Sequence, residues 1–172
     1  MAIRIRDFKH ILEQVVWFWL FLALTITCWA IDVHRIKVYG TSVDMPLTQI
    51  DARLAKLGFQ QTVRPSTERI PGAEDHLWAR SNGDQLVVVT LKGKLLLIKP
   101  RAIQFKEHPL RLGDSEKKLL SVLGKPQRRS RLKEHEQELA FNDEEHLVPL
   151  YVRLRGSTII EFQISPGPDD PG

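Results

Sequence analysis

Histidines and carboxylates are the chemistry-bearing side chains that gather in this sequence. Six histidines are spread along the chain, and two of them stand in short clusters of metal-ligand types. The clusters are His135-Glu136-x-Glu138 and Glu144-Glu145-His146. A metal site needs such ligands four residues apart on a helix or paired across a hairpin. His135 and His146 could flank one hairpin, but solvated charge on exposed strands explains both clusters, so we expect no metal site.

Motifs of catalysis are missing from the sequence. Asp75-His76 could form an acid–base pair, but no Gly-x-Ser-x-Gly nucleophile motif accompanies it. Gly93-Lys94 lacks the upstream glycine and the following Ser or Thr of a phosphate-binding loop. Cys28 is the single cysteine, so the chain can form no internal disulfide. We therefore expect no enzyme, no cofactor and no small-molecule substrate.

A strongly basic segment, KPQRRSRLK, covers residues 125–133. Its cations could contact anionic lipid head groups or another protein, and Arg128, Arg129 and Arg131 are the basic partner-binding residues we expect. No aromatic side chains alternate with these cations, and the net charge is only +4, which argues against nucleic acid. Three glutamates follow directly, so a solvated hairpin with paired charges is the competing interpretation.

Trp78 and Phe141 are the aromatic residues that we consider for partner binding. They occupy similar places in the two halves of the sequence. Exposed aromatic side chains are common hot spots of protein interfaces, whereas buried ones only support the core. Both roles are open at this point.

An uncharged apolar stretch over residues 15–31, VVWFWLFLALTITCWAI, dominates the N-terminal part. As a helix, residues 11–31 match a hydrocarbon core of about 30 Å. Residues 1–10 carry slightly more positive charge than the segment that follows the stretch, which predicts a cytoplasmic N-terminus. A signal peptide cleaved near Cys28-Trp29-Ala30 is the alternative.

The rest of the chain alternates between helix and strand patterns. Ile50, Leu54 and Leu57 recur on one face of a predicted helix over 48–57, with Thr48 as its N-cap. A second helix is predicted from Asp114 to Gly124. The predicted strands lie at 75–80, 86–91, 95–105, 139–141, 147–154 and 157–164, with turns at Asn82-Gly83, Gly93 and Arg155-Gly156. The tail 165–172 is predicted to be disordered.

The two halves resemble each other in order and spacing. Leu54-x-x-Leu57-Gly58 is repeated as Leu120-x-x-Leu123-Gly124, and Val89-x-Leu91-Lys92-Gly93 as Val152-x-Leu154-Arg155-Gly156. Self-similarity of this kind indicates a structural duplication. Each unit would be one helix followed by a three-stranded antiparallel meander, and two units could share one sheet. The units would cover 32–105, including a linker, and 106–164.

The segment Gly113-Asp114-Ser115-x-x-x-Leu119-Leu120-x-x-Leu123-Gly124-Lys125-Pro126 resembles the helix signature of the SmpA/OmlA family. That family includes the small lipoprotein of the outer-membrane barrel-assembly machine, and its unit in tandem is similar to β-lactamase inhibitor protein. The chain lacks the lipobox cysteine of the family's lipoproteins. The resemblance implies a non-enzymatic domain that binds other proteins beside a membrane.

These observations predict an α+β fold with one N-terminal transmembrane helix and two helix-plus-meander repeats. We expect a single-pass protein of the inner membrane with a periplasmic C-terminal domain. Its predicted function is that of a membrane-anchored, protein-binding scaffold or assembly factor, with the lipid bilayer and an envelope protein or complex as partners. The alternative is an inhibitor or immunity protein that blocks an enzyme or toxin.

Overall fold

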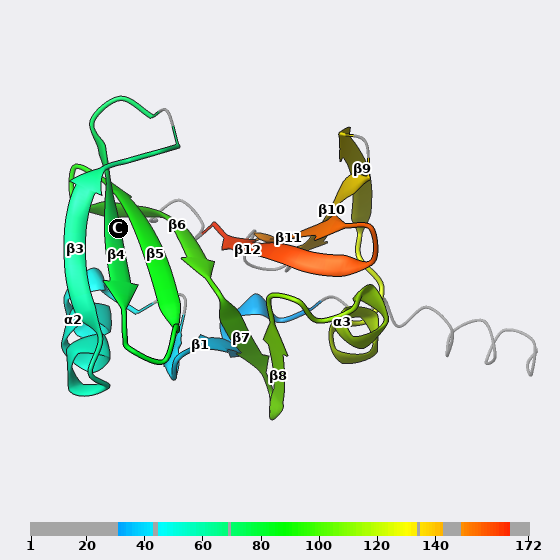
Figure 1. Cartoon of the computed structure of the whole chain (residues 1–172), viewed down its shortest axis with the longest axis horizontal. Helices are drawn as coiled ribbons and strands as arrows, with labels where there is room; N and C mark the ends of the chain where they lie inside the picture. The colour runs from blue at the N-terminus through cyan, green and yellow to red at the C-terminus, as the bar shows by residue number, and fades with distance from the viewer. Residues whose placement is uncertain (1–30, 43–44, 69, 134, 143–148, 166–172) are drawn as a thin grey trace, which may run out of the picture.

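Strands dominate the part of the chain that the computed structural model describes, residues 31–42, 45–68, 70–133, 135–142 and 149–165. Twelve strands and two α-helices lie there, together with one short 3-10 helix (Figure 1). The elements are η1 (Val33–Arg35), β1 (Ile36–Val38), β2 (Thr41–Ser42), α2 (Leu47–Lys56), β3 (Gln60–Pro65), β4 (Ala73–Ala79), β5 (Gln85–Leu91), β6 (Lys94–Pro100), β7 (Ala102–Phe105), β8 (His108–Arg111), α3 (Glu116–Leu123), β9 (Arg128–Lys133), β10 (Glu136–Asn142), β11 (Pro149–Arg155) and β12 (Thr158–Ile164).

Eight of the strands form one antiparallel sheet in the order β3-β4-β5-β6-β12-β11-β10-β9. Each half of this sheet comes from one half of the chain, as a helix followed by four strands, where the sequence predicted three. The last strands of the two halves, β6 and β12, lie side by side in the middle, with Ile98 opposite Ile164. The first strands, β3 and β9, therefore lie at the two outer edges.

One row of side chains crosses the large sheet and supports the core. Residues directly opposite one another on neighbouring strands share a face. The row runs through His76, Val88, Ile98, Ile164, Leu150 and Phe141. All of its apolar members are buried and belong to one hydrophobic cluster that includes residues of both halves.

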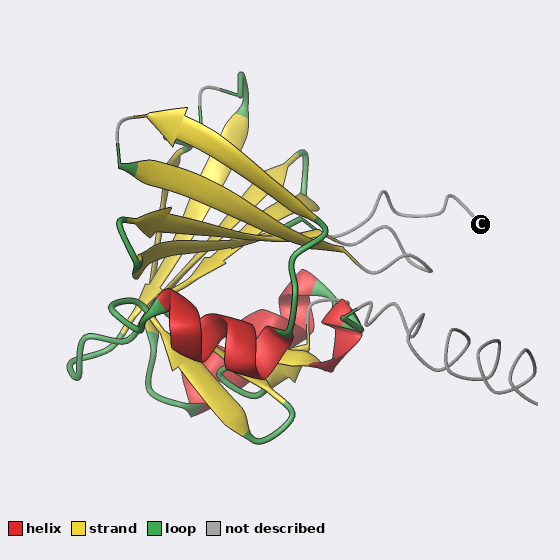
Figure 2. Ribbon diagram, turned by 90° about the vertical axis from the view of Figure 1, so that its right-hand side faces the viewer, coloured by secondary structure: helices red, strands yellow, loops and turns green. Residues whose placement is uncertain are grey.

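Two helices and a smaller sheet cover this face (Figure 2). Ile50 and Leu54 of α2 are buried, as are Leu119 and Leu123 of α3, so each helix turns an i, i+4 pair toward the core. The smaller sheet has the order β2-β1-β7-β8 and joins the segment after residue 31 to the connection between the two halves.

The repeat is displaced by one residue from the match that the glycines indicated. Each inner hairpin contains a register shift, which follows Val89 in β5 and Arg153 in β11. Counted from these bulges, Val152 corresponds to Val88 and not to Val89. Gly93 is the second residue of its turn and Gly156 the first of its own, because Leu91 pairs with Lys94 and Arg155 with Thr158. Both halves thus have a glycine in the turn between their last two strands, but the glycine occupies a different position of that turn in each half.

The expected α+β fold class is wrong, because the described residues are mainly antiparallel β-sheet. No helix among them is long and apolar enough to cross a membrane. The helix expected over 11–31 lies outside the described residues except for Ile31, which is buried in the core of the domain. This finding contradicts the interpretation as a single-pass inner-membrane protein. Residues 1–10 and all but Ser165 of the tail 165–172 also lie outside the described residues.

Candidate functional site

Trp78 and Phe141 lie in the core. Trp78 is 4% exposed and faces Leu86, while Phe141 is fully buried and faces Leu150. Their places in the two halves are equivalent, since Leu86 and Leu150 start the same row of buried side chains in β5 and β11. The core interpretation therefore holds for both, and neither ring offers a surface to a partner.

The three arginines lie together on the edge strand β9. This strand pairs with β10 on one side and with none of the other described strands on its outer side. Five of its six side chains are exposed. Because strands alternate their side chains, Arg129 and Arg131 share the helix-covered face with Leu139 and Gln137, while Arg128 lies on the opposite face. The bulge between β9 and β10 leaves Leu132 without a direct partner, and its side chain is 42% exposed.

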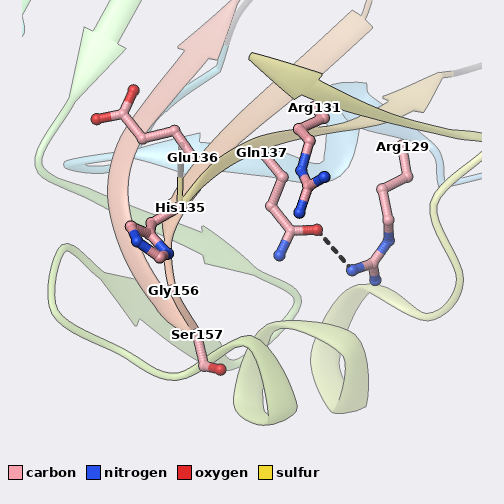
Figure 3. A pocket seen from close by; sticks show the side chains of 7 residues that line it. All are labelled: Arg129, Arg131, His135, Glu136, Gln137, Gly156 and Ser157. Atoms are coloured by element: carbon pink, nitrogen blue, oxygen red, sulfur yellow. Dashed lines mark hydrogen bonds between the residues drawn. The ribbon is translucent and has the colours of Figure 1, made fainter. Parts of the chain in front are cut away.

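An open hollow of about 560 Å³ lies beside this edge, next to the turn between β11 and β12. Its walls are Arg129, Arg131, His135, Glu136, Gln137, Gly156 and Ser157 (Figure 3). Figure 3 shows Arg129, Arg131 and Gln137 side by side, with the carboxylate of Glu136 pointing away from them.

Glu136, which lines this hollow, and Glu116, which contacts one of its walls, both have cationic partners. Arg129 donates from Nη2 to Glu116 Oε1 at 2.6 Å and from Nη1 to Gln137 Oε1 at 2.8 Å. Glu136 Oε1 lies 2.9 Å from Arg155 Nη2. Arg131, in contrast, has no hydrogen-bond or ion-pair partner among the residues that the structure describes. Among the described residues, the hollow thus offers an uncompensated guanidinium and no uncompensated carboxylate.

A row of alternating charges crosses the other face of the large sheet. Lys99 pairs with Glu68 of the β3–β4 loop and lies 3.1 Å from Glu161 Oε1. Glu161 Oε2 accepts a second ion pair from Arg153 at 2.7 Å. Further along, Arg128 lies 3.8 Å from Glu138. These charges neutralise one another, so this face has less to offer a charged partner than the β9 edge has.

Asp75 and His76 do not form the acid–base pair that the sequence could have held, because neighbours on a strand point to opposite faces. Asp75 is buried, and this burial alone would raise its pKa. Hydrogen bonds from Ser66 and Thr67 and the charge of Arg64 outweigh burial and hold the pKa of Asp75 below its ordinary value. His76 lies on the other face, where its Nε2 is 3.1 Å from Thr90 Oγ1.

No group of three or more potential metal ligands gathers in the described ranges of the chain. His135 lies at the hollow beside β9, whereas His146 falls outside the described residues. Whether these two histidines flank one hairpin therefore depends on a residue that lies outside the described part.

Two parts of the site were not expected from the sequence. Glu116, the first residue of α3, pairs with Arg129 at one wall of the hollow, and Gly156 and Ser157 line the hollow from a turn that is distant in sequence. No local signal marks these residues, because they join β9 only through the sheet order and through the position of α3. The isolated bridge between Ser115 and Thr158 fixes that position.

Comparisons of this chain with protein-family models, with curated proteins and with solved structures found no match. The resemblance to the SmpA/OmlA family therefore stays a prediction.

Proposed function

We propose that this chain is a protein-binding module, and that it binds an extended segment of a partner at an edge of its eight-stranded sheet. The observation that carries the proposal is strand β9, which is exposed and has no neighbour on its outer side among the described strands. An edge strand presents N–H and C=O groups that can pair with an added strand.

Exposed apolar side chains on both edge strands support this function. Val63 of β3 is 50% exposed and Leu132 of β9 is 42% exposed, and both rank among the few large apolar side chains that are exposed in the described part. A strand added at either edge would cover such a side chain while it satisfies the backbone of the edge. An assembly or scaffolding role is compatible with this mode of binding.

The inhibitor alternative has less support. It called for a concave face with exposed aromatic side chains, yet the exposed large apolar residues of the described part are Leu57, Val63 and Leu132, none of them aromatic. The sheet face away from the helices instead carries the self-neutralising charge row. We therefore favour edge binding over the blocking of an active site.

Site-specific photocrosslinking tests the proposal. A photoreactive amino acid replaces Leu132 or Val63 in the full-length chain in its native host, and Leu57, equally exposed but at the end of α2, serves as the matched control. We expect a discrete protein adduct from an edge position and none from Leu57. The partner identified by mass spectrometry is then purified and its binding to the chain is measured directly.

Edge blocking supplies the second half of the test. In the variant Leu132→Pro, proline removes the N–H of the bulge residue that has no direct partner on β10, and bulges on edge strands tolerate proline. Binding of the purified partner should fall at least tenfold with unchanged thermal stability. Equal adducts from all three positions, or unchanged binding by Leu132→Pro at an edge that crosslinks, would overturn edge binding.

A further inference from the structure

We infer that the β9 edge selects an acidic extended segment and that one carboxylate of this segment enters the hollow at Arg131. This inference rests on the proposed function and adds the chemistry of the partner.

The charges of β9 are the first step. The strand contains four cations, Arg128, Arg129, Arg131 and Lys133, and no acid. Arg128 and Arg129 have acidic partners within the domain at 3.8 Å and 2.6 Å. Arg131 and Lys133 have none among the described residues. An added strand with basic side chains would place like charges directly opposite those of β9, which destabilises a strand pair. Acidic side chains would instead form favourable ion pairs with Arg131 and Lys133.

The same charges exclude a second copy of this chain at β9. Two β9 strands paired antiparallel would bring eight cations together. Charged side chains and a bulge are devices by which natural sheets discourage such edge-to-edge pairing. At β9 the positive charges discourage pairing with a basic strand but favour pairing with an acidic one, because the acidic side chains attract the cations.

The hollow is the second step. The Arg131 side chain lies beside Gln137, whose Oε1 is occupied by Arg129 and whose Nε2 is a donor without a described acceptor (Figure 3). Ser157 adds a hydroxyl at the far wall. A guanidinium fork with a neighbouring amide donor suits a carboxylate, which accepts two parallel hydrogen bonds. The nearby acids that the structure describes do not compete, since Glu116 and Glu136 are held by Arg129 and Arg155.

The other edge provides the contrast. Strand β3 carries the single cation Arg64, which lies 3.7 Å from the buried Asp75. Its remaining side chains are uncharged. The two edge strands thus have equivalent positions in the large sheet but different charges. Of these two edges, only the unpaired edge of β9 carries an unpaired guanidinium beside a hollow.

Binding of three designed peptides to the full-length chain tests the inference. The capped probes are Thr-Glu-Val-Glu-Val-Glu-Thr and its analogues with glutamine or lysine in place of glutamate, each followed by fluorescence anisotropy. We expect the glutamate peptide to bind at least tenfold more tightly than the glutamine peptide and the lysine peptide to bind least. Arg131→Gln should weaken the glutamate peptide about tenfold and leave the glutamine peptide unchanged, because only the charged hydrogen bonds are lost.

Two variants and one competitor make the result decisive. Arg131→Lys keeps the charge but not the fork, so its loss should be intermediate. Lys56→Gln removes the same charge from the exposed side of α2 and should have no effect. Equal binding of the glutamate and glutamine peptides would overturn the acidic preference and leave edge binding intact. Failure of all three peptides would overturn both. If an oligothymidylate of eight nucleotides bound more tightly than the glutamate peptide, the inference would also be overturned, and nucleic acid would be the better ligand of the β9 edge.

Discussion

The ammonium group of Lys99 lies 3.1 Å from a carboxylate oxygen of Glu161, across the two strands that join the halves of the large sheet. Lys99 is also paired with Glu68, so it connects a loop of the first half to a strand of the second. Burial alone would lower the pKa of Lys99, but its hydrogen bonds to both glutamates raise the pKa above its ordinary value. The pair is thus a charged contact at the junction of the two halves.

A double-mutant cycle measures this contact. Lys99→Met should lower the free energy of unfolding by about 1–2 kcal/mol, because it leaves Glu68 without its cation and Glu161 with Arg153 alone. Combined with Glu161→Gln, the loss should be smaller than the sum by about 1 kcal/mol. Urea unfolding of the four proteins checks this, with the exposed Lys56→Met as control. If the two losses of unfolding free energy add within about 0.3 kcal/mol, the contact between Lys99 and Glu161 does not contribute to stability.

Asp75 makes the stability of the domain depend on pH. Its folded pKa lies below its ordinary value, so its stabilising contribution is complete above the unfolded pKa and is lost as the pH falls through the folded pKa. Asp75→Asn should therefore be less stable than the parent chain by about 1–3 kcal/mol at pH 7. This difference should shrink as the pH is lowered from about 5 to about 2.

Chemical unfolding across that pH range, followed by tryptophan fluorescence, checks the Asp75 prediction. The exposed Asp32→Asn is the matched control, since its ion pair with Arg35 lies at the surface. A constant difference between Asp75→Asn and the parent chain at all pH values would contradict the linkage.

Phe141 should act through stability and not through binding. Phe141→Ala leaves a cavity at a fully buried position and should cost about 3–5 kcal/mol. Leu57→Ala removes an apolar side chain that is 43% exposed and should change stability by less than about 0.5 kcal/mol. Thermal or urea unfolding distinguishes the two, and similar losses for both would contradict the assignment of Phe141 to the core.

The turn between β5 and β6 can be improved. Lys92 and Gly93 both have positive φ, 52° and 77°, and they form a two-residue hairpin loop of the type that favours Asn-Gly. Lys92→Asn should raise the free energy of unfolding by about 0.5–1 kcal/mol, because asparagine adopts this conformation at lower cost than lysine. Lys56→Asn, at the last residue of α2, should do the opposite, because lysine has the higher helix propensity and its charge suits the helix C-terminus. A loss of stability in Lys92→Asn would refute the turn assignment.

Local signals predicted the elements well where local chemistry decides them. The helix expected over 48–57 is found at Leu47–Lys56, and the turns at Asn82-Gly83, Gly93 and Gly156 all join neighbouring strands. Capping was less predictable. Pro46 precedes α2 in place of the expected Thr48 cap, and Ser115 caps α3 where Asp114 was expected. Asp114 instead accepts from the backbone N–H of Arg111 and from Lys118.

The remaining features depend on contacts between distant segments, which no local pattern encodes. The smaller sheet pairs Ile36 with Phe105, and the sequence around either residue contains no signal that predicts this pairing. Leu57 has the helical spacing of a core residue but lies one turn beyond the buried pair of α2, and it is exposed. The hollow at Arg131 forms where the β11–β12 turn lies beside β9 and β10. Sequence identified the cations of this site but neither its walls nor which cation stays unpaired.

The central position of β6 and β12 has a consequence for how the chain can be divided. Ile98 and Ile164 face each other there and belong to one core that draws on both halves. A fragment ending near residue 105 would expose the flank of β6 together with half of that core, and a fragment starting there would do the same with β12. Although the two halves look like copies, we expect that neither folds on its own and that the domain unfolds as a single cooperative unit.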